Sequence, residues 1–234
     1  MPRTYLYKLT SDRGGAPSAP PPRSGEVPLL TLSICKPAIR RTAQPGDRII
    51  GLTSRALAES DRYPLHAIIY AAVVEDALDA REYYASRSRF RDRPDCIYRF
   101  HQSNGTIEHS GRTPLHADPA YQSRDIGQYP FYRNGRTLLS RDFRYFGPKA
   151  VALPSRLEML WKMSEALGQG HRVFADTAPE QPELKALFQL LWSRPTRYTP
   201  AVVTSEAYGH APRLRRDVAM EKTGNASWPS PQRP

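Results

Sequence analysis

The segment LLTLSICKPAIRRTAQPGDRIIG, residues 29–51, decides how this chain is expected to fold. An apolar run ends at Cys35-Lys36-Pro37, two arginines follow, and Pro45-Gly46-Asp47 precedes a second apolar run. Because proline fixes φ and glycine permits positive φ, Pro45-Gly46 predicts a tight turn that leads into a strand. The segment therefore places a cysteine and several cations between two buried segments, where binding residues often lie.

The composition indicates a basic globular protein with room for one sizeable core. The 234 residues include 34 Lys and Arg against 23 Asp and Glu, which gives a formal net charge of +11. This surplus favours a polyanionic partner such as nucleic acid, or an anionic membrane surface; solubility alone or a GC-rich genome is the alternative explanation. Arginine outnumbers lysine, and its planar fork suits phosphate and guanine.

Several classes of protein are excluded by what the sequence lacks. No apolar run approaches the roughly 20 residues that span a bilayer, and no secretory signal follows Met1. Cys35 and Cys96 do not make a disulfide framework, so we expect a cytoplasmic protein with reduced thiols and no membrane partner. The six histidines lack metal-ligand spacing, and no glycine-rich phosphate loop is present. We therefore expect neither a metal nor a cofactor.

Local patterns predict an α+β fold. Alternating or apolar runs predict strands at residues 4–9, 48–53, 65–74, 96–100 and 137–140, with a hairpin turn at Asn104-Gly105. Residues 29–35 fit either a short strand or one helical turn. Helices are expected at 76–86, from Ser155 to Leu167 with Glu158 completing a capping box, and at 182–192. Residues 111–128 are expected to form a long loop.

The chain divides into three parts on these patterns. Residues 1–178 form the main domain, and residues 179–195 add a C-terminal helix packed on it. Residues 196–234 lose hydrophobic periodicity and gain Pro, Ser and Arg, which is typical of a disordered basic tail.

A set of motifs in the main domain resembles a known family. The motifs are Cys35-Lys36-Pro37-Ala38-Ile39-Arg40-Arg41, Gly46-Asp47-Arg48-Ile49-Ile50-Gly51, Arg93-Pro94-Asp95-Cys96-Ile97-Tyr98, Leu139-Ser140-Arg141-Asp142-Phe143-Arg144-Tyr145-Phe146-Gly147 and Gly168-Gln169-Gly170-His171. Together they resemble the nucleotide modification associated domain 2 family of bacterial and phage proteins, over roughly residues 4–175. The resemblance implies a link to pathways that alter bases in DNA.

The same segments are also similar, more distantly, to the PUA, EVE and ASCH group of small barrels. Those barrels bind RNA or flip a modified base into a pocket, so the fold-level analogy implies a PUA-like mixed β-barrel with flanking helices. We accordingly expect a DNA-binding or other nucleic-acid-binding domain that accommodates an extruded base. The residues expected to hold phosphates are Lys36, Arg40, Arg41, Arg48 and Arg93. Those expected to line the base pocket are Asp47, Asp95, Tyr98, Phe143 and Tyr145.

Two other functions stay open at this point. The first is an enzyme that acts on a base or nucleotide, with Cys35 as nucleophile, because adjacent cations favour its thiolate. His171 is then the candidate base and Asp142 the group that orients it. The second is an adaptor whose basic tail recruits a DNA-modification enzyme.

Overall fold

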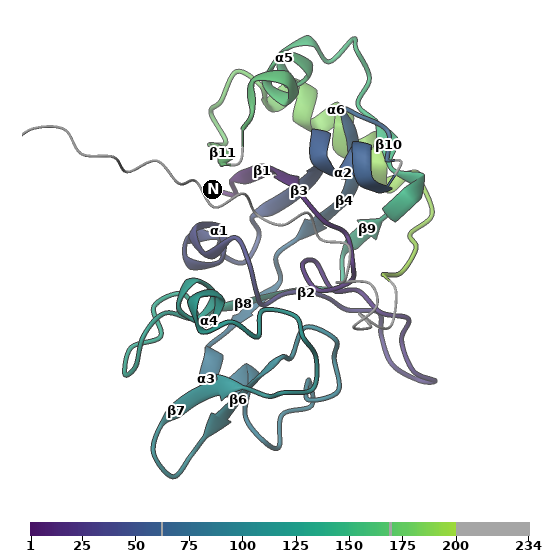
Figure 1. Ribbon diagram of the computed structural model, residues 1–234. Coiled ribbons are helices and arrows are strands. Elements are labelled where there is room, and N and C mark those ends of the chain that lie inside the picture. Colours follow the sequence, from purple (N-terminus) through teal and green to yellow (C-terminus); the bar gives the residue numbers. More distant parts are fainter. Residues whose placement is uncertain (62, 169, 200–234) are drawn as a thin grey trace, which may run out of the picture.

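The computed structural model describes residues 1–61, 63–168 and 170–199 (Figure 1). Its largest element is a six-stranded mixed sheet in which β10-β4-β3-β1-β11 are neighbours and β9 also pairs with β4. The strands are β1 (Thr4–Leu9), β3 (Arg48–Thr53), β4 (Ala67–Val73), β9 (Phe143–Tyr145), β10 (Val151–Ala152) and β11 (His171–Phe174). β1 and β3 are parallel, and the other pairs are antiparallel.

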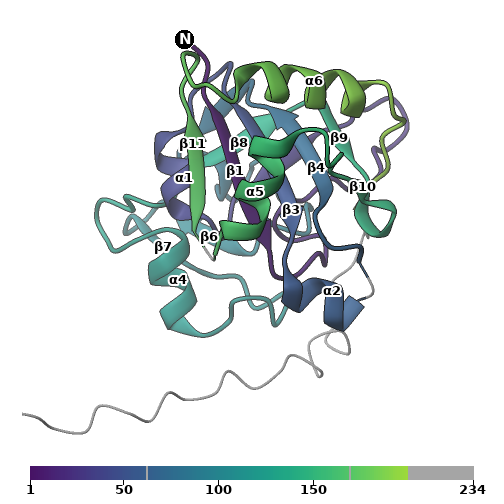
Figure 2. The same cartoon turned by 90° about the horizontal axis from the view of Figure 1, so that it is seen from above.

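The main sheet is covered on both faces, which follows from the alternation of side chains along its strands. Tyr5, Tyr7 and Ile49 project into one core, whereas Leu6 and Ile50 project into a second core on the opposite face. Helices α5 (Glu158–Ala166) and α6 (Gln181–Trp192) contribute to this second core. Figure 2 shows α5 lying across the sheet. A short helix α2 (Arg55–Asp61) and the 3-10 turn η1 (Gly147–Lys149) complete this half of the molecule.

The other half is built on a three-stranded antiparallel sheet and a hairpin. The sheet has the order β2-β8-β5, from β2 (Leu30–Leu32), β8 (Thr137–Ser140) and β5 (Asp76–Leu78). The hairpin joins β6 (Tyr98–His101) and β7 (Thr106–His109), and α3 (Ala80–Tyr83) and α4 (Pro119–Asp125) pack near it. Helix α1 (Pro37–Thr42) lies between the two halves (Figure 1). A third core fills this half.

The α+β class is confirmed, but the PUA-like closed barrel is not. The described strands form separate sheets rather than one closed ring. The strands predicted at 4–9 and 48–53 match β1 and β3, and residues 29–35 contain the short strand β2. The apolar run at 65–74 is the buried strand β4, and Asn104-Gly105 forms the predicted hairpin turn, with Gly105 at φ +73°.

Two helix predictions and one loop prediction need correction, and side chains that cap helices explain two of the three. Asp79 accepts a hydrogen bond from the Arg81 backbone at 2.8 Å and starts α3 there, so the preceding residues form β5 instead of helix. Asp118 caps α4 in the same way within the expected loop. The third correction concerns α5, which begins at Glu158 after an N-cap residue, Leu157, that makes no side-chain hydrogen bond. The capping box is therefore not formed.

The predictions for the C-terminal part can be compared with the structure only as far as residue 199. Helix α6 matches the expected helix at 182–192 and packs on the second core. Residues 196–199 are described, and they hydrogen-bond the main domain through Arg197 N to Tyr145 O and Thr199 N to Ala19 O. The remainder of the predicted tail, residues 200–234, lies outside the described residues. No helix of the described chain is long and apolar enough to cross a membrane.

Candidate active site

Cys35 lies on a sharp turn between β2 and α1. Its φ is +56° and that of Lys36 is +40°, so two consecutive non-glycine residues adopt the left-handed conformation. Such residues cost of order 1–3 kcal/mol each and are concentrated at functional sites. Pro37 then opens the helix with a φ that suits its first position. This strand–turn–helix connection leaves the Cys35 side chain only partly buried.

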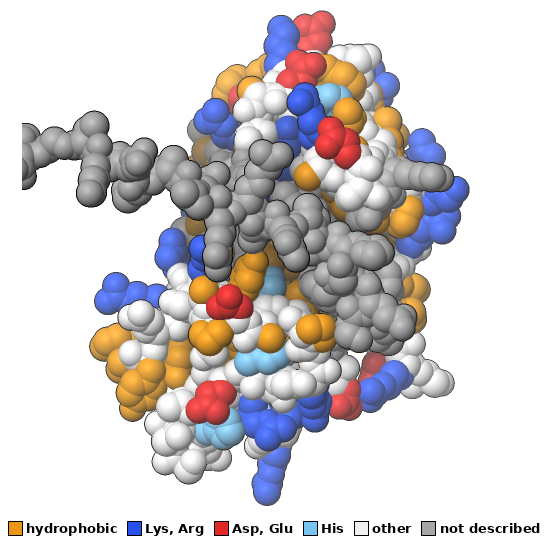
Figure 3. Space-filling view, viewed as in Figure 1, with side chains coloured by type: hydrophobic (Ala, Val, Ile, Leu, Met, Phe, Trp, Pro, Cys, Tyr) orange, Lys and Arg blue, Asp and Glu red, His pale blue; other side chains and the backbone are white. Residues whose placement is uncertain are grey.

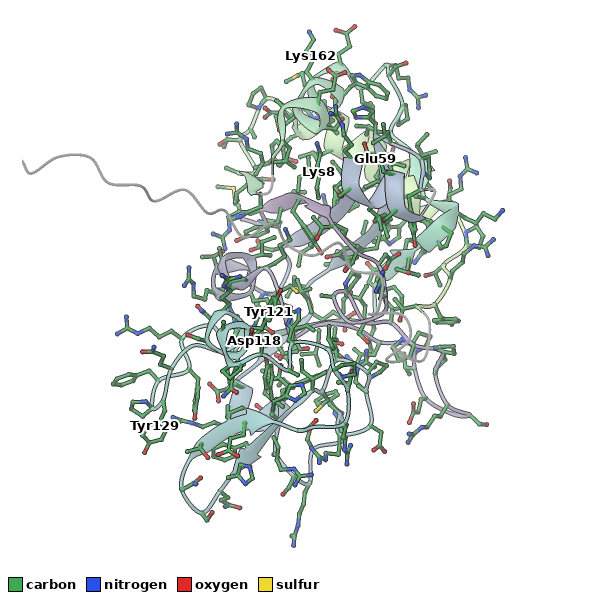
Figure 4. The ribbon with its side chains drawn as sticks, viewed as in Figure 1. Lys8, Glu59, Asp118, Tyr121, Tyr129 and Lys162 are labelled. Carbon is green, nitrogen blue, oxygen red and sulfur yellow. The ribbon has the colours of Figure 1, made fainter. Side chains whose placement is uncertain are left out.

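A histidine and a buried aspartate from a distant part of the chain complete the site. Cys35 Sγ lies 3.7 Å from His116 Nε2, and His116 Nδ1 lies 2.6 Å from Asp125 Oδ2. His116 comes from the loop before α4, and Asp125 is the last residue of that helix. The imidazole stacks on Tyr121 of α4, with ring centroids 4.6 Å apart and planes 15° apart. Figure 4 shows Tyr121 and Asp118 near the centre of the molecule.

His116 is held in its protonated form. Burial alone lowers the pKa of His116, but hydrogen bonds to Asp125 and Cys35 outweigh it and raise the pKa to about 10. An imidazolium beside a sulfur atom stabilises the thiolate, which is the nucleophilic form of cysteine. The site therefore places a protonated imidazole 3.7 Å from the Cys35 sulfur.

Asp125 is fixed by further donors. Its Oδ1 accepts the Cys35 backbone N–H at 2.8 Å, and its Oδ2 also accepts the Tyr98 hydroxyl at 2.9 Å. Burial and the neighbouring Asp125 charge raise the pKa of Tyr98, so this hydroxyl stays a donor. One carboxylate thus orients both the histidine and the backbone of the turn at Cys35 and Lys36. We call this turn the nucleophile turn, because Cys35 is the candidate nucleophile.

Arg40 holds the turn from inside the protein. Its side chain is 0% exposed and donates to the backbone carbonyls of Cys35, Asp125, Asn134 and Arg136. A guanidinium group has five N–H donors in a fixed planar arrangement, so it can serve several carbonyls at once. Arg40 therefore links the nucleophile turn to the end of α4 and to the segment before β8.

A second group of polar side chains consists of Lys36 and two residues of the main sheet, Tyr7 and His171. Lys36 Nζ lies 4.8 Å from the centre of the Tyr7 ring, and Tyr7 is directly opposite His171 in the β1–β11 pair. Burial lowers the pKa of Lys36, and burial together with the Lys36 charge lowers the pKa of His171. Lys36 therefore interacts electrostatically with Cys35 on one side and with His171 on the other.

The same three residues could be considered as metal ligands, because one donor atom from each lies within 4.8 Å of the others. However, His116 directs Nε2 to the sulfur and Nδ1 to the carboxylate, so its two neighbours contact different ring nitrogens. An ion bound by Cys35 Sγ and His116 Nε2 would not also bind the Asp125 Oδ2 atom that contacts Nδ1. The arrangement fits a proton-transfer chain better than a metal centre.

The predicted catalytic residues are only partly brought together. Cys35 is at the site, but no hydrogen bond among the described residues joins it to Asp142 or His171. Asp142 lies in the turn between β8 and β9, where its Oδ1 accepts the Trp192 indole N–H at 2.7 Å. His171 begins β11 and stacks near Tyr5, with ring centroids 6.3 Å apart.

The residues expected to line a base pocket are in the packed interior. All five have at most 2% exposure: Asp47, Asp95, Tyr98, Phe143 and Tyr145. Asp95 accepts from Thr31, Ser33 and Tyr83, and Asp47 caps the turn at Gln44. These side chains stabilise the fold around the site and do not surround one open hollow.

The predicted phosphate-binding residues are spread over the molecule. Arg40 is buried, as described above, and is not available to a phosphate. Arg93 donates to Ser18 O and Leu29 O, and Arg48 lies 4.6 Å from the Phe188 ring centre. Lys36 is next to the nucleophile, and the exposed Arg41 donates to Asn134 Oδ1 at 2.9 Å.

Sequence reasoning missed His116 and Asp125 as site residues. They lie 81 and 90 positions after Cys35, and no spacing in the sequence indicates that they meet it. One local signal was present: Asp118-Pro119 is a typical start of a helix, and recognising α4 would have shown that Asp125 belongs to an ordered element.

The fold and the site together define an α+β protein with a Cys-His-Asp thiol site. The family model of the nucleotide modification associated domain 2 matches residues 1–206, so the chain belongs to that family. This extends the match beyond the residues on which the resemblance was first noticed, and it associates the chain with nucleotide modification. Neither curated proteins nor solved structures gave a match.

Proposed function

We propose that this chain is a thiol-dependent enzyme that modifies a nucleotide or nucleobase. Cys35 is the nucleophile, His116 is the acid–base group and Asp125 positions His116. The observation that carries the proposal is the chain of contacts Sγ–Nε2–Nδ1–Oδ2, at 3.7 Å and 2.6 Å. The family match supports the substrate class, because it associates the chain with nucleotide modification.

The proposed chemistry uses the sulfur of Cys35 and the proton on His116. The thiolate forms a bond from Sγ to an electron-poor carbon of the substrate, and the bond from that carbon to the leaving group breaks with its electron pair moving to the leaving atom. The proton on His116 Nε2 then neutralises that developing charge. In the second step His116 takes a proton from a water molecule, whose oxygen bonds to the same carbon; the carbon–Sγ bond breaks, and its electron pair returns to sulfur as the thiolate.

The test is a comparison of the whole protein with Cys35→Ala and His116→Gln. Modified nucleosides in the DNA of expressing cells are measured by mass spectrometry after complete digestion. We expect a base change that requires both side chains, whereas Cys96→Ala, which removes the buried second thiol, leaves it in place. A base change that persists in Cys35→Ala would refute the proposal.

A module that binds nucleic acid without catalysis is the second candidate, and one surface feature favours it. A groove of about 500 Å³ is lined by Arg23, Arg89, Arg93 and Arg141, together with Phe90, a run of prolines and the acidic Glu26 and Asp92; Arg23 pairs with Asp92 and Arg141 with Glu75. Guanidinium groups around an apolar floor suit a phosphate backbone and its bases. If Cys35→Ala binds DNA as the wild type does and no base change is detected with either, this candidate replaces the enzyme.

A further inference from the structure

The segment between α4 and β8 exposes two large aromatic side chains. We call residues 127–135 the aromatic loop; in it Tyr129 is 61% exposed and Phe131 is 73% exposed. They are the two most exposed aromatic side chains in the part of the chain that the structure describes. Tyr129 lies at the outer edge of the molecule (Figure 4), and Figure 3 shows hydrophobic side chains gathered at that edge with basic ones beside them. Exposed apolar clusters of this kind usually mark a binding surface.

The aromatic loop is held in a fixed shape by hydrogen bonds at its base. The buried Tyr132 accepts the Ile107 N–H at its hydroxyl, at 2.7 Å, and donates to Gly105 O at 3.3 Å. Gly135 N donates to Tyr132 O at 2.7 Å, and Asn134 N donates to Ile126 O at 3.1 Å. The two exposed rings are therefore presented on a rigid support, which lowers the entropic cost of binding with them.

Arginines lie in and next to the aromatic loop. Arg133 lies 5.8 Å from the centre of the Phe131 ring, and Arg81 donates to Pro130 O at 2.7 Å. Arg41 and Arg124 flank the base of the loop through Asn134, which accepts from the first and donates to the backbone of the second. None of these four arginines forms an ion pair with a carboxylate within the described residues. A cationic border around aromatic rings is complementary to a nucleic-acid strand, whose phosphates and bases need these two chemistries.

A direct set of hydrogen bonds connects the aromatic loop to the candidate active site. Arg40 donates to Asn134 O of the loop and to Cys35 O of the nucleophile turn. In addition, α4 carries Asp125 and ends two residues before the loop begins. The backbone of the loop and the backbone at Cys35 are therefore held by the same buried arginine.

We propose that Tyr129 and Phe131 stack on unpaired bases of a nucleic-acid strand whose target nucleotide enters the thiol site. This inference rests on the proposed function and specifies its substrate, which is a base within a polynucleotide and not a free mononucleotide. Stacking on aromatic rings tolerates any base, so the loop contributes affinity without sequence preference. The surrounding arginines contact the phosphates on either side.

The test is a fluorescence-anisotropy titration of the full chain with a labelled single-stranded DNA of about 12 nucleotides, a length within the usual site sizes. Tyr129→Ala and Phe131→Ala are each expected to weaken binding about tenfold without changing its salt dependence. Phe131→Trp keeps an aromatic ring and is expected to bind with wild-type affinity. Arg133→Gln should also weaken binding and reduce the salt slope by about one. Leu65→Ala, at a residue that is 51% exposed outside this loop, is the matched control and should bind like the wild type.

The rate at which iodoacetamide alkylates Cys35 is measured in the same variants and should not change. Equal affinity in the Tyr129→Ala, Phe131→Ala double variant and the wild type would overturn the inference. The inference would also be overturned if the variants bind DNA like the wild type but lose binding to phosphatidylglycerol vesicles, since the loop would then contact membranes. If Cys35 does not react with iodoacetamide but the loop variants still weaken DNA binding tenfold, the proposed enzyme would be refuted and the binding surface would be supported.

Discussion

Replacing Arg40 with methionine separates a structural role of this residue from a role in binding phosphate. Arg40 is fully buried and donates to four backbone carbonyls, so Arg40→Met leaves those oxygens without their donor. At about 1 kcal/mol for each buried acceptor, the lower end of the usual range, the loss amounts to about 4 kcal/mol of unfolding free energy. This is a large share of the 5–15 kcal/mol that typically stabilises a domain.

Urea unfolding followed by circular dichroism measures this loss. With a slope of about 2 kcal/mol per molar urea, a loss of 4 kcal/mol lowers the midpoint by about 2 M. The neighbouring Arg41 provides the control, because it is exposed and makes one side-chain hydrogen bond, to Asn134. Arg41→Met should change the unfolding free energy by less than about 0.5 kcal/mol. We also expect Cys35 alkylation to slow in Arg40→Met, because the turn loses its anchor. Similar midpoints for the two variants would show that Arg40 does not hold the turn.

Three further predictions concern protonation and packing. His116 has a folded pKa of about 10 against 6.5 for an ordinary histidine, so its stabilising contribution is complete below pH 6.5 and lost as the pH rises to about 10. The difference in unfolding free energy between wild type and His116→Gln should therefore shrink between pH 7 and 10; a constant difference would contradict this assignment. Gly51→Ala places a methyl group 2.4 Å from the Tyr70 ring and should cost about 3 kcal/mol in a thermal melt, whereas Gly168→Ala, with open space around it, should cost little. Asp95→Asn can keep an oxygen towards the three hydroxyl donors but turns its NH2 group towards Arg93 Nε, which lies 3.5 Å from the replaced oxygen, and should cost about 3 kcal/mol in urea; a loss under 1 kcal/mol would show that the Arg93–Asp95 contact contributes little.

The fold could be predicted from sequence wherever short-range patterns decide the structure. β1 has alternating aromatic residues, β3 is an apolar run that follows a turn, and α6 has an apolar stripe, so their positions were predicted closely. Whether the sheet closes into a barrel depends on which strand edges meet, and no local pattern contains that information. The resemblance to small barrels therefore suggested closure that the described strands do not show.

The candidate site was harder to predict because its members meet only through tertiary structure. Cys35 was recognised from its cationic neighbours, but His116 and Asp125 reach it across a long separation in sequence. Arg40 and Arg41 are adjacent and identical in type, yet one is buried and the other exposed, and only the orientation of α1 distinguishes them. Tyr98 was expected to stack on a base, whereas its hydroxyl fixes Asp125.

The order of the site residues along the chain has a consequence for synthesis. Cys35 leaves the ribosome 81 residues ahead of His116, so the nascent chain carries a thiol that lacks its activating partner. The complete set forms only after α4 has been made and has docked through Asp125. Under the proposed mechanism, acid–base assistance by His116 therefore becomes available to Cys35 only after this half of the protein has folded.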